Sequence, residues 1–327
     1  MHEILILLIV LAIIFDISNG WHDCANAIAT VVSTRVLSPT VAVSLAAIMN
    51  ILGAFLTTAV AKTMGKGIVD PKAITDVVII AALLSAFLWN LITILMGLPV
   101  SSSHALIGGI IGASVSHGGV GLLNFAGISK IVIVLLISPV VGFAIGYMFM
   151  KLILYIFGRL APGTISKHFA RLQILSSAMM ALGHGSNDAQ KVMGIITMAL
   201  FSAGTIQTLE VPGWVMLVSA LAMGVGTLFG GWKIIKTLGV KMLKLEPIHG
   251  FAAETSATLT ILTASHLGMP VSTTHVISSS ILGVGATKRL SAVRWGIAGK
   301  ILMAWLLTLP VCIALAWGIV KIFPPIK

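Results

Sequence analysis

Two short stretches of this sequence combine hydroxyl side chains with a histidine in nearly the same order. Residues 97–104 read GLPVSSSH, and residues 268–275 read GMPVSTTH. Proline followed by a serine or threonine cap marks a helix start, and the free backbone N–H groups at such an end attract anions. Hydroxyl groups also donate hydrogen bonds, which suits an anion with several acceptor oxygens, such as phosphate. The candidate phosphate-binding residues are therefore Ser101, Ser102, Ser103, Ser272, Thr273 and Thr274.

Each hydroxyl run could instead only cap its own helix or bond back to the preceding turn. The repetition of the run favours the anion site, because one anion could be held between the two copies. No arginine lies in either run, so release of a bound anion would not have to break a bidentate clamp. We expect His104 and His275, which end the runs, to orient the hydroxyl groups rather than to bind a metal ion.

Two aspartates, Asp23 and Asp188, lie inside apolar segments. A carboxylate within a membrane segment costs on the order of 3 kcal/mol, so it normally has a partner or a function. Amide side chains accompany both aspartates: Asn26 the first, Asn187 and Gln190 the second. Carboxylate and amide oxygens are ligands of hard cations. We therefore predict sodium sites at the two aspartates and expect both to border the phosphate; the alternative is that each only caps a half-helix.

Glu254 is a further carboxylate in an apolar segment, next to Thr255 and Ser256. It could pair structurally with a buried polar group, or it could contribute to coupling with sodium ions or protons. The sequence leaves both possibilities open, and we include Glu254 among the candidate sodium ligands. Sodium is the only metal that the sequence indicates, and no cofactor is expected because nucleotide-binding and zinc-protease motifs are absent from it.

The composition indicates an all-α polytopic membrane protein. Of the 327 residues, 58% are hydrophobic and 9% are charged. Apolar runs recur that exceed the roughly 20 residues needed to cross a bilayer, and alternating ten-residue strand patterns do not occur. The net charge of +11 arises mainly in the connections between these runs. The positive-inside rule explains this distribution better than nucleic acid binding does, so no nucleic acid partner is expected.

The aspartate and the hydroxyl run each occur twice, and the separation between the two aspartates is nearly the same as that between the two hydroxyl runs. This agreement predicts an internal duplication. Broken helices are expected because polar residues and the glycines Gly20 and Gly185 interrupt the first apolar run of each half. The first run lacks the features of a signal peptide and is expected to be retained. The predicted first repeat is 1–158, with a broken helix at 3–34, a helix at 40–61, a hairpin at 73–118 and a helix at 127–158. After a cytoplasmic linker at 159–172, the second repeat is 173–327, with a broken helix at 173–202, a helix at 213–238, a hairpin at 247–287 and a helix at 289–323.

The second repeat is expected to be inverted relative to the first. A hairpin returns to its own side of the membrane, so each repeat crosses an odd number of times, and both termini then lie outside. The basic residues Arg35, Lys288, Arg289 and Arg294 and the loops at 159–171 and 233–244 fall on the side assigned to the cytoplasm. The loop from Lys62 to Lys72 falls outside. Inverted repeats whose interrupted helices meet near mid-membrane are the architecture of secondary transporters.

Several motifs together resemble one family, the inorganic phosphate transporters (PiT), which include sodium/phosphate symporters. These motifs are GWHDCANA at 20–27, GHGSNDAQ at 183–190, the two hydroxyl runs, GFAAE at 250–254 and WLLTLP at 305–310. The resemblance implies phosphate uptake coupled to a cation and a homodimer. It places the hydroxyl runs in the phosphate site, and its cation-linked signature contains Asp23, Asn26, Asp188 and Gln190. The sequence differs from the commoner pattern Gly-Ala-Asn-Asp at Trp21 and His22, so no role is carried over for an asparagine at position 22.

We therefore predict a cell-membrane (inner-membrane) transporter that imports phosphate with sodium ions by alternating access, through rocking of the two halves. Oxygen-only ligand sets favour sodium; the alternatives within the family are proton coupling and a metal-phosphate or sulfate substrate. A passive anion channel is a further alternative. An intramembrane hydrolase using Ser101 or Ser103 with His104 and Asp23 is disfavoured, because catalysis needs one asymmetric set of roles and every candidate here occurs twice.

Overall fold

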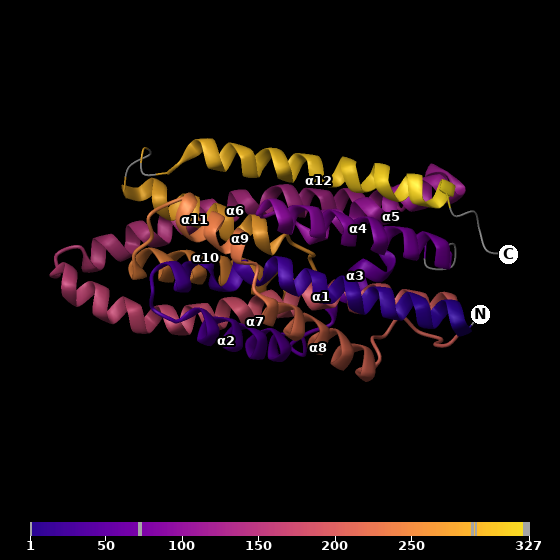
Figure 1. The fold of residues 1–327 in the computed structure, drawn as a ribbon, viewed down its shortest axis with the longest axis horizontal. Coiled ribbons are helices and arrows are strands. Elements are labelled where there is room, and N and C mark those ends of the chain that lie inside the picture. Colours follow the sequence, from indigo (N-terminus) through magenta and orange to yellow (C-terminus); the bar gives the residue numbers. More distant parts are fainter. Residues whose placement is uncertain (1, 71–73, 289–290, 292, 323–327) are drawn as a thin grey trace.

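The computed structural model describes residues 2–70, 74–288, 291 and 293–322, and in these the chain is almost entirely helical. The helices lie roughly along one long axis (Figure 1). No β-strand occurs in the described ranges beyond an isolated bridge between Val69 and Leu123. The α-helices are α1 His2–Ser33, α2 Pro39–Gly53, α3 Ala59–Lys66, α4 Asp76–Met96, α5 Ser102–Gly118, α6 Phe125–Phe157, α7 Pro162–Ser202, α8 Gly213–Phe229, α9 Trp232–Lys236, α10 Pro247–His266, α11 Thr273–Lys288 and α12 Trp295–Ile322.

The prediction of a multi-pass, all-α membrane protein is confirmed. Within the described residues, four helices are long and apolar enough to cross a bilayer, namely α1, α4, α6 and α12. The bent pair formed by α8 and residues 232–241 could supply a fifth span. The longest helix, α7, carries many polar residues at its centre, and these face other protein segments because residues 180–200 are almost all buried.

The two predicted hairpins are present as α4–α5 and α10–α11. Each turns at a glycine with a left-handed backbone, Gly97 at φ +69° and Gly268 at φ +67°, a conformation that side chains with a Cβ disfavour. Ser101 then caps α5 by accepting a hydrogen bond from the His104 backbone N–H at 3.2 Å. Ser272 caps α11 in the same way, from His275 at 3.2 Å. The hairpins enter from opposite ends of the molecule and their turns meet near its middle (Figure 1).

The predicted breaks in the first helix of each half are wrong: α1 and α7 are continuous through Asp23 and Asp188. The glycines taken as break points are instead sites of close helix packing. A Cβ on Gly20 would collide with the backbone oxygen of Met223 in α8, and one on Gly185 with that of Asn50 in α2. Hydroxyl groups of the neighbouring hairpins donate to Asp23 and Asp188, so the helices need not open there to provide partners for the two carboxylates.

The interruptions fall in the second helix of each half, where unbroken helices at 40–61 and 213–238 were expected. Residues 54–58 separate α2 from α3. A bend of 63° at Gly230 and Gly231 separates α8 from α9, and Gly230 has φ +65°. The predicted linker at 159–172 is already helical from Pro162. The last helix starts at Trp295. Residues 289, 290, 292 and 323 of its predicted range and residue 73 of the predicted first hairpin lie outside the described part.

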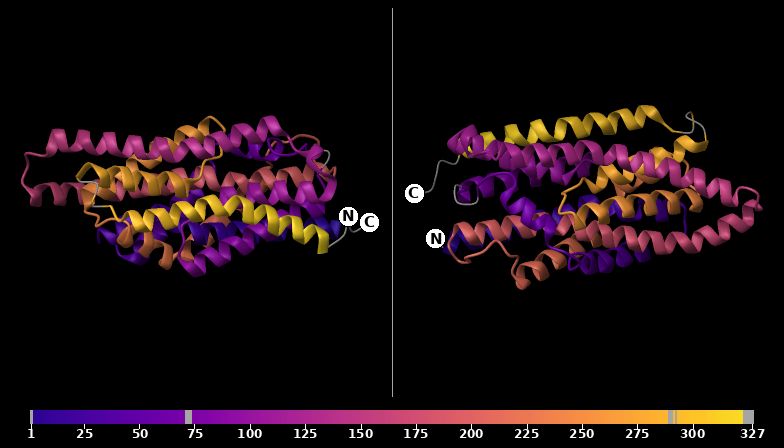
Figure 2. Two further views of the ribbon diagram at one scale, coloured as in Figure 1. Left: turned by 90° about the horizontal axis from the view of Figure 1, so that it is seen from above. Right: turned by 180° about the vertical axis from the view of Figure 1, so that it is seen from behind.

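The two halves interlock rather than forming separate bundles. The last helix of each half packs on the hairpin of the other, α12 on α5 and α6 on α11. In the same way α1 packs on α8, and α7 packs on α2. Figure 2 shows these helices side by side from two further directions. This exchange of neighbours brings residues from both halves to the centre of the molecule.

The start of α1 and the end of α12 lie at the same end of the molecule, and the α1–α2 and α6–α7 connections lie at the opposite end (Figures 1 and 2). This arrangement agrees with an odd number of crossings in each half. The inverted repeat itself, and the side of the membrane that each end faces, remain predictions.

Candidate functional site

The turns of the two hairpins are in direct contact beside the centres of α1 and α7. The Ser103 hydroxyl, in the first turn, donates a hydrogen bond to the backbone oxygen of Val271, in the second, at 3.1 Å. The ring centroids of His104 and His275 lie 4.7 Å apart. The two hydroxyl runs, 171 positions apart in the numbering, therefore form one continuous polar surface inside the membrane region.

Asp23 receives one hydroxyl from each hairpin. Ser102 donates to Asp23 Oδ2 at 2.9 Å, and Thr274 donates to Oδ1 at 3.0 Å. His22 Nδ1 lies 2.8 Å from the same Oδ1, and the Asp23 side chain is 1% exposed. A buried carboxylate thus connects α1 to the tips of both hairpins.

Asp188 lies opposite Asp23 and has a different set of partners. Thr273 donates to its Oδ2 at 3.3 Å, and the Lys191 Nζ lies 2.8 Å from its Oδ1. The hydroxyls of two consecutive threonines in the second hairpin therefore reach different carboxylates, Thr273 that of Asp188 and Thr274 that of Asp23. Asp188 is completely buried.

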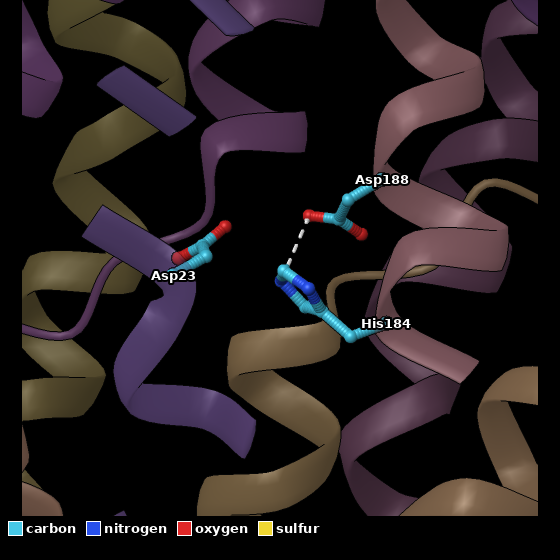
Figure 3. Close-up of side chains that lie close together, drawn as sticks. All are labelled: Asp23, His184 and Asp188. Atoms are coloured by element: carbon cyan, nitrogen blue, oxygen red, sulfur yellow. Dashed lines mark ion pairs between the residues drawn. The ribbon is translucent and has the colours of Figure 1, made fainter. Parts of the chain in front are cut away.

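His184 extends between the two carboxylates (Figure 3), with its Nε2 3.8 Å from Asp188 Oδ2. One ligand atom from each of Asp23, His184 and Asp188 lies within 4.8 Å of the others. The other ring nitrogen of His184 is 3.0 Å from Asn50 Oδ1, which fixes the ring. Two carboxylates this close repel each other unless positive charge lies between them. The cluster is thus suited to bind a cation.

Asn26 is the predicted amide ligand that contacts the hydroxyl groups of the second hairpin. Its Nδ2 donates to the hydroxyls of Thr274 at 2.9 Å and Thr273 at 3.4 Å. Its Oδ1 is buried and has no hydrogen-bond partner within the described residues. An oxygen in that position is available as a cation ligand, and the sodium-binding role of Asn26 stays a prediction.

Asn187 and Gln190 contact other parts of the protein. Asn187 Nδ2 donates to Ser265 and to the Met269 backbone oxygen, at 3.0 and 3.3 Å, and so holds the second hairpin turn. Its Oδ1 has no hydrogen bond among the described residues. Gln190 Oε1 accepts from the first backbone N–H groups of α3, those of Val60 at 2.9 Å and Ala61 at 3.2 Å. These bonds occupy both lone pairs of that oxygen, so Gln190 supports the interruption between α2 and α3.

Glu254 belongs to a separate buried network. Its carboxylate accepts hydrogen bonds from Thr30 and Ser176, and from Gln173 Nε2 at 3.2 Å. Thr30 is seven residues beyond Asp23 on α1, which corresponds to about 10 Å along the helix axis. Of the two roles considered for Glu254, these contacts favour structural pairing between α1, α7 and α10.

His104 and His275 lie behind the hydroxyl groups, as expected for residues that orient the turns. Trp305 of α12 stacks on His275, with ring centroids 3.9 Å apart. The same indole donates a hydrogen bond to the backbone oxygen of Pro99 at 2.8 Å. A single aromatic side chain therefore braces both hairpin turns from the outside.

The sequence interpretation missed Lys191. The signal was present, because a lysine in the middle of an apolar run needs a buried anion, and Lys191 follows Asp188 by one helical turn. Its side chain is 2% exposed. His184, which the sequence indicated only as a weaker candidate than His104 and His275, likewise proves central to the cluster.

Comparisons of the sequence and of the structure with known proteins both find phosphate transporters. The model of the phosphate transporter family matches residues 19–316. A probable low-affinity inorganic phosphate transporter of Bacillus subtilis (strain 168) is 48% identical, over 94% of this chain and 93% of that protein. One from Rhizobium meliloti (strain 1021) is 46% identical, over 94% and 92%. A solved structure described as the sodium-dependent phosphate transporter has a TM-score of 0.92 at 26% identity, covering 99% of this chain and all of that one.

Proposed function

This chain belongs to the phosphate transporter family, and we propose that it imports inorganic phosphate by symport with sodium ions. The family and its relatives are transporters and not enzymes, so the hydrolase alternative is dropped. The observation that carries the proposal is the buried cluster in which hydroxyl groups of two hairpin turns bridge Asp23 and Asp188. The printed description of the structural neighbour as sodium-dependent supports the choice of cation.

The proposed binding step exchanges hydrogen-bond partners. Ser102, Thr273 and Thr274 donate to the two aspartates, although the same hydroxyls could donate to a phosphate oxygen. A sodium ion bound by Asp23 and by Asn26 Oδ1 would satisfy that carboxylate and free the hydroxyls of Ser102 and Thr274 to rotate toward phosphate. The cation also offsets the cost of placing an anion beside carboxylates in a medium of low dielectric constant.

We further propose that access alternates by movement of the hairpins. The sequence predicted rocking of the two halves, but each hairpin packs on the last helix of the other half, so the halves cannot separate as rigid bodies. Each moving unit consists of one hairpin and the last helix that packs on it. The first unit is α4, α5 and α12, the second is α10, α11 and α6, and both would move against α1 and α7. Parting of the turns at Ser103 and Val271 would open the site toward one end of the molecule at a time.

Purified protein in liposomes tests the symport. We expect an inward sodium gradient to drive labelled phosphate above its equilibrium level, because the gradient supplies the free energy. Replacement of sodium by choline should abolish this accumulation.

Other outcomes would favour the alternatives to sodium symport. Accumulation driven by a pH gradient alone would favour proton coupling. Magnesium-dependent uptake would indicate a metal-phosphate substrate, and competition by sulfate would indicate the sulfate alternative. Non-saturating, cation-independent flux would indicate a channel, and indifference to both gradients would exclude symport.

We also propose that the protein resides in the cell membrane with both termini outside, supported by the basic residues of the predicted cytoplasmic connections. Lys167 and Thr208 are exposed near opposite ends of α7, while the native cysteines Cys24 and Cys312 are buried. In intact cells, a membrane-impermeant thiol reagent should label T208C and spare K167C. The reverse pattern would reverse the orientation.

A homodimer is the assembly that the family resemblance implies, and we propose it for this chain. Light scattering in detergent should then give a protein mass about twice that of the 34.2 kDa chain. A mass equal to one chain would contradict the dimer.

A further inference from the structure

Lys191 is a buried basic residue inside the candidate site. Its Nζ lies 2.8 Å from Asp188 Oδ1, and the two side chains are 2% and 0% exposed. A buried ammonium is tolerated only beside a carboxylate, and Asp188 supplies one.

The two halves differ at this position. Asp23 and Asp188 occupy corresponding places in the two signature segments, and the residue three positions later is Asn26 in the first and Lys191 in the second. Residues three apart lie on the same face of a helix, so both side chains adjoin their aspartate. The first half presents a neutral amide with a free oxygen, whereas the second half presents a positive charge.

The position of the ammonium conflicts with a sodium ion on the same carboxylate. Lys191 already occupies Asp188 Oδ1, and the other oxygen, Oδ2, accepts from Thr273 and faces His184. A sodium ion bound to Asp188 would lie within a few ångströms of the ammonium, and like charges at that separation in a buried site repel strongly. Asp23 has no lysine or arginine within ion-pair distance among the described residues.

We propose that the Lys191 ammonium is a tethered substitute for one coupling ion: it occupies the cation position at Asp188, and transported sodium binds on the Asp23 side. The inference rests on the proposed sodium symport and refines it. A charge fixed to the protein helps to hold phosphate but is not carried across the membrane. The number of sodium ions moved with each phosphate is therefore lower by one than in a carrier with two open aspartate sites.

Parallel uptake of labelled sodium and labelled phosphate into liposomes measures this number. Lys191→Asn gives the second half the side chain found in the first, and we expect about one additional sodium ion per phosphate. Lys191→Arg keeps the charge and should keep the wild-type ratio. Lys191→Asn and Lys191→Met both remove the ammonium charge. If both variants keep the wild-type sodium-to-phosphate ratio, the proposal is overturned, because the charge of Lys191 would then have only a structural role.

A second variant covers the case in which removal of the lysine alone prevents folding. The double variant Asp188→Asn with Lys191→Met removes the ion pair as a unit and leaves no unpaired buried charge. We expect its sodium-to-phosphate ratio to equal that of the wild type, even if phosphate binds more weakly. A ratio lower by one would mean that Asp188 itself holds a transported sodium ion, and would overturn the proposal.

Failure of the proposed sodium symport can be distinguished from failure of the proposal for Lys191. If the wild-type protein carries phosphate without any sodium, sodium symport is excluded. The proposal that the Lys191 ammonium takes the place of a coupling ion is not excluded by that result. The asparagine variant should then acquire sodium uptake that the wild type lacks. If it does not, the tethered cation is excluded as well.

Discussion

Replacement of Asp23 by asparagine should lower phosphate uptake by about 100-fold or more, because it removes the carboxylate that would pair with sodium, and loss of one partner of a buried ion pair costs about 3–5 kcal/mol. Ser102 and Thr274 each donate to one of its oxygens. An asparagine keeps one acceptor oxygen and loses the charge that would bind sodium. Initial rates of labelled phosphate uptake in liposomes, with a sodium gradient imposed, measure the loss.

Glu210 provides the matched control for this loss. It is an exposed carboxylate in the connection between α7 and α8. Glu210→Gln makes the same chemical change away from the cluster and should leave uptake unchanged. If the Asp23 variant folds, as judged by an unaltered elution profile in detergent, and retains more than half of the wild-type rate, the cluster is not the transport site.

Gly185→Ala should destabilise the protein strongly, although it adds only one methyl group. The added Cβ would overlap the backbone oxygen of Asn50, which belongs to a rigid helix and cannot rotate away. Overpacking of this kind typically costs about 1–3 kcal/mol, which for a chain of 327 residues corresponds to a fall in melting temperature of roughly 1–5 °C. Displacement of Asn50 would also disturb the 3.0 Å contact that fixes His184. Thermal unfolding in detergent measures the effect.

Gly299→Ala is the control, because Gly299 lies within α12 with open space around its Cβ position. Alanine favours a helix over glycine by about 1 kcal/mol, so this variant should be equally stable or slightly more stable. The pair also tests the corrected role of Gly185. If Gly185 marked a helix break, as the sequence suggested, alanine would be tolerated there, and equal melting temperatures for both variants would restore that interpretation.

The class of protein, its helices and its two hairpins could be predicted from the sequence because their signals are local. Long apolar runs specify membrane helices wherever they lie in the fold. At each hairpin turn, a glycine in the left-handed conformation, a proline and a capping serine fix the backbone through neighbouring residues alone. The repetition of these signals also predicted that the two hydroxyl runs and the two aspartates act together.

The positions of the helix interruptions could not be predicted, because they depend on packing. Gly20 and Gly185 look like break points in the sequence, yet each lies against the backbone of another helix, and α1 and α7 continue through them. Gln190 looks like a cation ligand, but its oxygen caps α3, which is about 130 residues away in the chain. Which polar groups pair is decided only when distant helices meet.

The sequence by itself therefore determined that this protein is a helical membrane transporter with two aspartates and two hydroxyl-bearing turns, since composition and short motifs carry that information. Only the tertiary structure decided that α12 braces the hairpin of the other half, that His184 joins Asp23 and Asp188, and that Lys191 neutralises one of them. The physical reason is that a buried charge must be satisfied by whichever groups the packed helices bring within reach, and sequence spacing does not specify those groups.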